Sequence, residues 1–74
     1  MAEFSLLSEI SGRVWQMLKS PGDAVAAGEP VLIVEAMKME IPIAPEQAAT
    51  VRELRIAEGD EIEEGQVVAI LEVA

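Results

Sequence analysis

The stretch "GRVWQMLKSPGDAVAAGEPVLIVE", residues 12–35, returns later in the chain as "ATVRELRIAEGDEIEEGQVVAILE", residues 49–72. Gly22 and Gly59 hold the same place in the two copies and lie 37 positions apart. Further pairs at this spacing are Asp23 and Asp60, Val25 and Ile62, Gly28 and Gly65, Val31 and Val68, Ile33 and Ile70, and Glu35 and Glu72. Several matches at one spacing, glycines included, identify an internal repeat, and this repeat decides the fold.

Each copy has the residue pattern of β-strands. In "VWQML" (14–18) and "VRELRI" (51–56) we expect apolar residues on alternate positions to face the core, as in strands with one buried face. The runs "VLIV" (31–34) and "VVAIL" (67–71) have the length expected of buried strands. Between these strands, Gly and Asp in both copies favour tight turns around a short middle strand. We therefore expect strand, turn, short strand, turn and strand in each copy.

Two units of this size cannot each bury a face alone, so we expect them to pack together. The prediction is an all-β fold, a flattened barrel or sandwich whose halves are related by a pseudo-twofold axis. The 74 residues suit a single domain over 1–74, and a chain with only Phe4 and Trp15 as aromatic residues builds its core from aliphatic side chains. No cysteine is present, so packing alone must stabilise the fold.

The segment "AMKMEIPI" (36–43) follows the first copy, whereas the second copy is followed only by Val73 and Ala74. If the halves are symmetric, Lys38 corresponds to the end of the chain. It should therefore lie in a hairpin tip, residues 36–39, at the edge remote from both termini. Local propensity in this segment favours a helix, but the segment is short, follows a β run and precedes Pro42, which disfavours a helix before it.

The net charge of −9 would repel nucleic acid and anionic membrane surfaces. We expect protein partners with neutral or basic docking faces, although a role of the acidity in solubility alone is an open alternative. The chain has no histidine or cysteine, so the usual general base, metal ligand and strongest nucleophile are missing. We therefore expect neither catalysis by this chain alone nor a metal site. The N-terminal "MAEFSLLSEI" lacks the pattern of a signal peptide and no segment is apolar for long enough to span a membrane, so we expect a cytoplasmic protein.

The motif "EAMKME" (35–40), between "SPGDAVAAG" (20–28) and "AEGDEIEEG" (57–65), resembles the attachment region of the biotinyl/lipoyl domain family. The similarity covers essentially the whole chain and is closest to small stand-alone biotin/lipoyl attachment proteins. It implies two four-stranded antiparallel sheets related by a pseudo-twofold axis. It also implies that a biotin protein ligase attaches biotin covalently to Lys38. The chain would then be a biotin carboxyl carrier, a monomer that serves biotin carboxylase and carboxyltransferase subunits.

The neighbours of Lys38 suggest how a ligase would recognise it. Met37 and Met39 offer flexible contact surface, although packing of both against the sheet is an alternative. Ala36 completes the motif, and the flanking Glu35 and Glu40 either contribute to recognition by charge or are simply solvated.

Lipoyl domains more often have Asp-Lys-Ala at the attachment lysine, so the two methionines favour biotin over lipoate. The alternative is a lipoyl carrier for an oxo-acid dehydrogenase complex, or a domain that accepts both groups. A third reading, a non-carrier interaction module with the same fold, fits the Met-Lys-Met sequence poorly.

Overall fold

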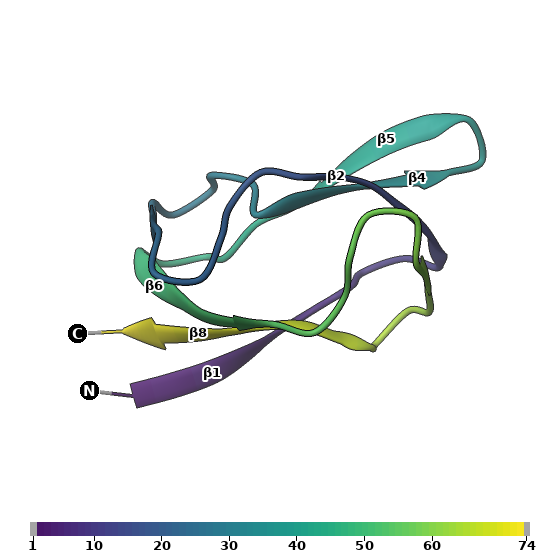
Figure 1. Ribbon diagram of the computed structural model, residues 1–74. Helices are drawn as coiled ribbons and strands as arrows, with labels where there is room; N and C mark the ends of the chain where they lie inside the picture. Colours follow the sequence, from purple (N-terminus) through teal and green to yellow (C-terminus); the bar gives the residue numbers. More distant parts are fainter. Residues whose placement is uncertain (1, 74) are drawn as a thin grey trace.

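The computed structural model describes residues 2–73, which form two four-stranded antiparallel sheets (Figure 1). The first sheet has the order β1-β8-β6-β3 and the second the order β5-β4-β2-β7. The strands are β1 (Ala2–Leu7), β2 (Gly12–Met17), β3 (Ala24–Val25), β4 (Leu32–Ala36), β5 (Met39–Ile43), β6 (Ala49–Leu54), β7 (Glu61–Ile62) and β8 (Val67–Val73). The predicted all-β fold of two such sheets is confirmed. Over these residues there is no helix, hence none that could cross a membrane.

The two sheets are counterparts of each other in strand register. Val14 on β2 lies opposite Val34 on β4, and Val51 on β6 lies opposite Leu71 on β8, with each residue shifted by the 37 positions of the repeat. Strands β5, β4, β2 and β7 correspond in this order to β1, β8, β6 and β3. The repeat in the sequence is therefore also a repeat of strand pairing.

Strand β1 is the one long strand that the sequence pattern does not indicate. It pairs with β8 as β5 pairs with β4: Ala2 lies opposite Val73, and Met39 lies opposite Ala36. The second sheet thus carries its edge strand through the β4–β5 hairpin, whereas the first sheet gains the same edge from the N-terminal segment. Figure 1 shows both chain ends together at one end of the molecule and the hairpin projecting at the other.

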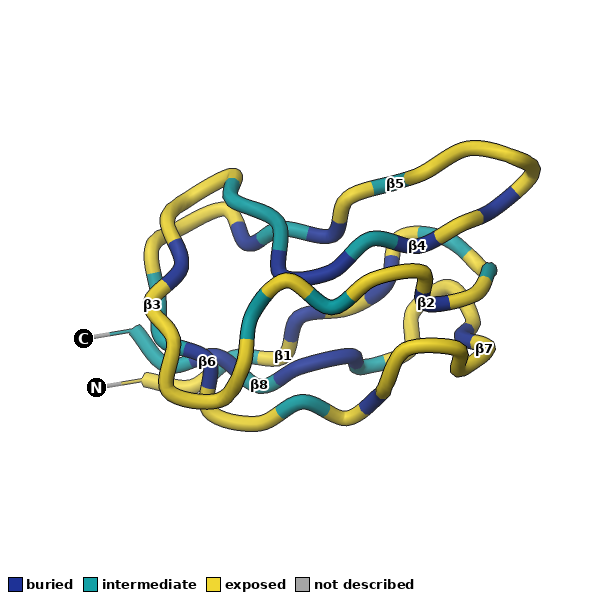
Figure 2. The backbone as a smooth tube through the Cα atoms, turned by 45° about the horizontal axis from the view of Figure 1, so that its top comes forward, coloured by how far each residue is buried: buried dark blue, intermediate teal, exposed yellow. Residues whose placement is uncertain are grey.

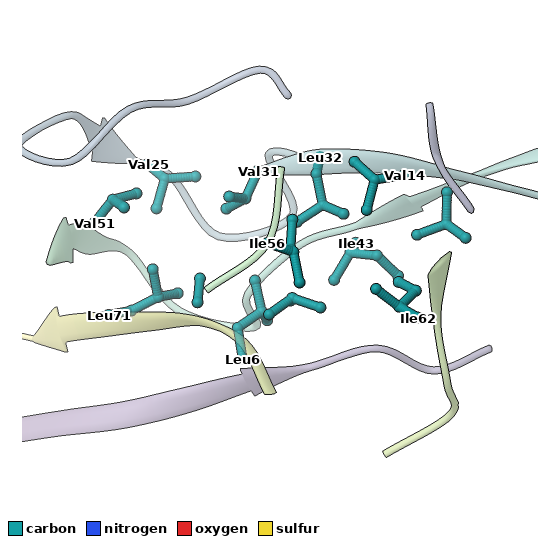
Figure 3. Packing of buried hydrophobic residues seen from close by; sticks show 13 residues of the cluster. Leu6, Val14, Val25, Val31, Leu32, Ile43, Val51, Ile56, Ile62 and Leu71 are labelled. Carbon is teal, nitrogen blue, oxygen red and sulfur yellow. The ribbon is translucent and has the colours of Figure 1, made fainter. Parts of the chain in front are cut away.

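The core lies between the sheets and consists of aliphatic side chains. Figure 3 shows several of them meeting from opposite sheets, and Figure 2 shows buried segments distributed over both sheets. Trp15 is 49% exposed and contributes no buried ring. The buried cluster comprises Leu6, Val14, Val25, Val31, Leu32, Val34, Ile43, Val51, Ile56, Ile62, Val68, Ala69 and Leu71. Each fully buried Val, Leu or Ile side chain stabilises the fold by about 1.5–3 kcal/mol relative to an exposed one.

Candidate functional site

Lys38 lies in the loop at the tip of the β4–β5 hairpin. The hairpin closes between Ala36 and Met39, which are paired across the two strands, so the loop consists of Met37 and Lys38. Both loop residues have positive φ, 52° at Met37 and 65° at Lys38. Two successive positive φ angles define the two-residue turn that best matches the twist of a hairpin, a turn that usually contains Asn-Gly. Residues with a Cβ disfavour positive φ, so the paired strands on either side must hold Met37 and Lys38 in this conformation.

The side chains at the tip face solvent. Met37 is 89% exposed and Met39 is 62% exposed, so neither methionine packs into the core. Lys38 and Glu40 are also exposed, whereas Ala36, the last residue of β4 before the loop, is buried. The loop thus presents one primary amine between two apolar, flexible thioether side chains.

Gly12, at the start of β2, allows close packing against the end of β4, next to the loop that carries Lys38. A Cβ at this position would lie 2.5 Å from the carbonyl oxygen of Glu35, 2.8 Å from a methyl carbon of Val34 and 3.1 Å from the Cβ of Ala36. Separations this short require the backbone to shift. Gly12 was not among the residues predicted from the sequence to belong to the site. The signal in the sequence was its counterpart in the other copy, Ala49, since one half of the repeat accepts a methyl group where the other does not.

The two glutamates of the motif lie directly opposite each other. Glu35 on β4 pairs in register with Glu40 on β5, and both side chains are exposed. Among the ion pairs found within residues 2–73, none includes either carboxylate. Like charges in directly opposed positions destabilise a strand pair, so this arrangement is unfavourable in the isolated protein.

The geometry suits acceptance of a covalent group and not catalysis. An exposed amine on a short, constrained turn can enter the active site of another enzyme. The chain contains neither histidine nor cysteine to activate that amine, and the loop neighbours of Lys38 are methionines. An enzyme that acylates Lys38 must therefore supply the activated acyl donor and the base.

Comparison with known proteins adds the family. The sequence pattern of the family described as "Biotin-requiring enzyme" matches residues 4–71. The biotin/lipoyl attachment protein of Bacillus subtilis is 39% identical over 59 residues, which cover 80% of this chain and 81% of that protein. In the crystal structure of the Kluyveromyces lactis urea carboxylase, a matching region has a TM-score of 0.89 and 35% sequence identity, and covers 96% of this chain.

Several relatives are far longer than this chain. The match spans 6% of the urea carboxylase chain and, at 38% identity over 65 residues, 4% of the urea amidolyase of Saccharomyces cerevisiae. The relatives also include a protein whose name refers to lipoyllysine and not to biotin. The dihydrolipoyllysine-residue succinyltransferase component of the 2-oxoglutarate dehydrogenase complex of Staphylococcus saprophyticus is 35% identical over 60 residues, which are 81% of this chain and 14% of that protein.

Proposed function

This chain belongs to the family of biotin/lipoyl attachment domains, and on that premise we propose that it is a biotin carboxyl carrier with biotin attached to Nζ of Lys38. The single observation that carries the proposal is the position of Lys38 in an exposed two-residue turn at positive φ, at the end of the molecule remote from both termini. An amine in this position can visit several active sites in turn while the two sheets remain folded.

The attachment reaction can be written for this side chain. The neutral Lys38 amine attacks the carbonyl carbon of biotinyl-adenylate in a biotin protein ligase. An amide bond forms, the bond between the acyl carbon and the phosphate oxygen breaks, and AMP leaves. The proton of the amine passes to a base of the ligase. When bound, biotin supplies a ring nitrogen that accepts and releases a carboxyl group.

The residues around Lys38 serve to orient the amine and to be recognised. The left-handed turn fixes the direction in which Lys38 leaves the hairpin. Met37 and Met39 provide an apolar surface that can adapt to a docking enzyme. Ala36 closes the hairpin, and Glu35 and Glu40 add charge selectivity. Later partners are biotin carboxylase and carboxyltransferase subunits, between which a monomeric carrier in the cytoplasm raises the effective concentration of the tethered group.

The choice of biotin depends on the two methionines beside Lys38, because lipoyl domains more often have Asp-Lys-Ala at this place. A lipoyl carrier is the second candidate function, and the similarity to the succinyltransferase component supports it. Because biotin carriers and lipoyl carriers share this fold, the selectivity of the ligase decides which group is attached to Lys38.

The test is direct modification followed by intact mass measurement. The unmodified chain is incubated with ATP and either biotin and a biotin protein ligase, or lipoate and a lipoyl ligase. We expect addition of one biotinyl group and no lipoyl group. Only Lys19 and Lys38 are lysines, so Lys38→Arg should abolish the modification and Lys19→Arg should leave it intact. Biotin on the Lys38→Arg variant would contradict the site, and a lipoyl group alone on the wild type would contradict the choice of cofactor.

A further inference from the structure

In the sheet formed by β1, β8, β6 and β3, an arginine of the same sheet forms ion pairs with two opposed glutamates. Glu3 on β1 and Glu72 on β8 lie opposite each other. Arg52, on the neighbouring strand β6, bridges them: its Nε lies 3.3 Å from Oε2 of Glu3 and its Nη1 lies 3.4 Å from Oε1 of Glu72. Arg52 is the extra residue of a β-bulge between Val51 and Glu53. One guanidinium group therefore holds two carboxylates on adjacent strands.

The sheet that carries Lys38 has the same two carboxylates but no arginine at the position that corresponds to Arg52. Glu40 and Glu35 are the repeat counterparts of Glu3 and Glu72, and they are opposed in the same way. The counterpart of Arg52 is Trp15, at the equivalent β-bulge on β2. Its side chain is 49% exposed, so the ring lies on the surface of the sheet and not in the core. An aromatic ring thus occupies the position from which the other sheet neutralises its glutamates.

The nearest cation does not take over this role. Arg13 lies in register with Glu35, but its guanidinium pairs with Glu61 on β7 at 3.9 Å. Strand β7 and the turn after it add negative charge on this side, because Glu61 and Glu63 stand where the other half has Ala24 and Ala26. The surface beside the hairpin is thus more acidic than its counterpart at the terminal end.

A second exposed apolar residue follows strand β2. Leu18, just beyond β2, is 40% exposed, and its repeat counterpart is Arg55, which pairs with Glu53 at 2.8 Å. Both arginines of the second copy therefore correspond to exposed apolar residues in the first copy, although Leu18 follows the end of β2 that pairs with the start of β4, away from Lys38. Trp15 stands at the repeat position from which Arg52 reaches two glutamates, and an aromatic ring there could stack with a guanidinium group that contacts both acids.

We propose that Glu35, Glu40 and Trp15 form a docking site for an arginine side chain of the biotin protein ligase. That arginine would occupy in the complex the position that Arg52 occupies within the other sheet. Arginine fits better than lysine because its planar fork reaches two acceptors at once, as Arg52 does here. This inference rests on the proposed function, since it names a contact with the enzyme that modifies Lys38.

The test compares variants as substrates of a biotin protein ligase, with biotin and ATP, in buffer of low ionic strength. Trp15→Arg should lower kcat/KM about tenfold through KM, because the new guanidinium fills the site from within the chain. The double variant Glu35→Gln with Glu40→Gln should show a similar loss, and its folding is secure because it removes a like-charge pair. The matched control is Arg52→Trp at the equivalent bulge of the other sheet, which should keep the wild-type kcat/KM. Thermal unfolding shows that each variant is folded.

Ionic strength provides a second measurement. Added salt should lower kcat/KM of the wild type, and lower it much less for Trp15→Arg, because the screened attraction is already absent there. A folded Trp15→Arg chain that is biotinylated as efficiently as the wild type overturns the inference, as does an equal loss in Arg52→Trp. A wild type that receives no biotin at all is a different result: it overturns the proposed function, and the docking site falls with it.

Discussion

Gly12 and Ala36 are in such close contact across β2 and β4 that a Cβ on Gly12 would lie 3.1 Å from the Cβ of Ala36 and 2.5 Å from the backbone oxygen of Glu35. The hairpin that carries Lys38 is therefore supported by a position where only glycine fits. In the other half of the repeat the same two positions are Ala49 and Val73, so the close approach is particular to the end with the lysine.

The first prediction concerns this contact. Gly12→Ala should reduce the free energy of unfolding by about 1–3 kcal/mol, because the added methyl group overlaps backbone that cannot move independently. Urea denaturation measures the change. In the reverse substitution, Ala49→Gly, no overlap is introduced, and we expect the backbone entropy cost of about 0.5–1 kcal/mol together with the loss of one methyl group that packs against the core. Equal losses in the two variants would show that the close approach at Gly12 is not the cause.

The second prediction concerns the left-handed turn. Met37→Asn should raise the free energy of unfolding by about 1 kcal/mol, because asparagine tolerates positive φ better than methionine does. The same substitution at Met39, which lies in β5 and outside the turn, should bring no such gain. Thermal unfolding of both variants decides the point, and a larger gain at position 39 would contradict it. Met37→Asn should nevertheless be a poorer ligase substrate, since it removes apolar contact surface.

The third prediction concerns pH. The backbone N–H of Ala26 donates a hydrogen bond to Oε1 of Glu29 at 2.9 Å, and Lys19 lies 3.0 Å from the other oxygen. These contacts, the backbone hydrogen bond first, lower the pKa of the Glu29 carboxyl below 4.5. The folded pKa is thus below the unfolded one, so this stabilisation is complete above the unfolded pKa and is lost as pH falls through the folded pKa.

Glu29→Gln should therefore be less stable than the wild type at neutral pH, with a difference that shrinks as the solution is acidified below pH 4.5. The design is close to natural, because the repeat counterpart is Gln66, whose Oε1 accepts the equivalent hydrogen bond from the N–H of Glu63 at 2.9 Å. Unfolding in urea at several pH values measures the difference. A gap that stays constant down to pH 3 would rule out ionisation of Glu29 as its source.

The fourth prediction concerns the core under the hairpin. Leu32 is fully buried at the start of β4, so Leu32→Ala should lower the free energy of unfolding by about 2–5 kcal/mol. Leu7 is 45% exposed at the end of β1, so Leu7→Ala should lower the free energy of unfolding much less. Denaturant unfolding compares the two. Similar losses would mean that the aliphatic cluster is not the main source of stability.

The fold could be predicted from the sequence because its evidence is local and repeated. Residues 14–18 and 51–56 were predicted as strands, and the 37-residue spacing shows that two such units pack together. Strict alternation would turn Gln16 and Leu18 inward, but both are exposed because a β-bulge at Trp15 shifts the register. The position of Lys38 followed from the same symmetry. Strand β1 was missed because its counterpart, β5, is joined to β4 by a hairpin, whereas β1 meets β8 only after the whole chain has folded.

The sequence by itself determined the two-sheet fold, the attachment lysine and the methionines beside it, since each depends on residue type and spacing along the chain. Only the tertiary structure decided which side chains lie across from one another: Glu35 opposite Glu40, Gly12 against Ala36, and Trp15 in the place of Arg52. The physical reason is that periodicity sets the face of a strand on which a residue lies, whereas cross-strand neighbours depend on register and bulges between segments distant in the chain.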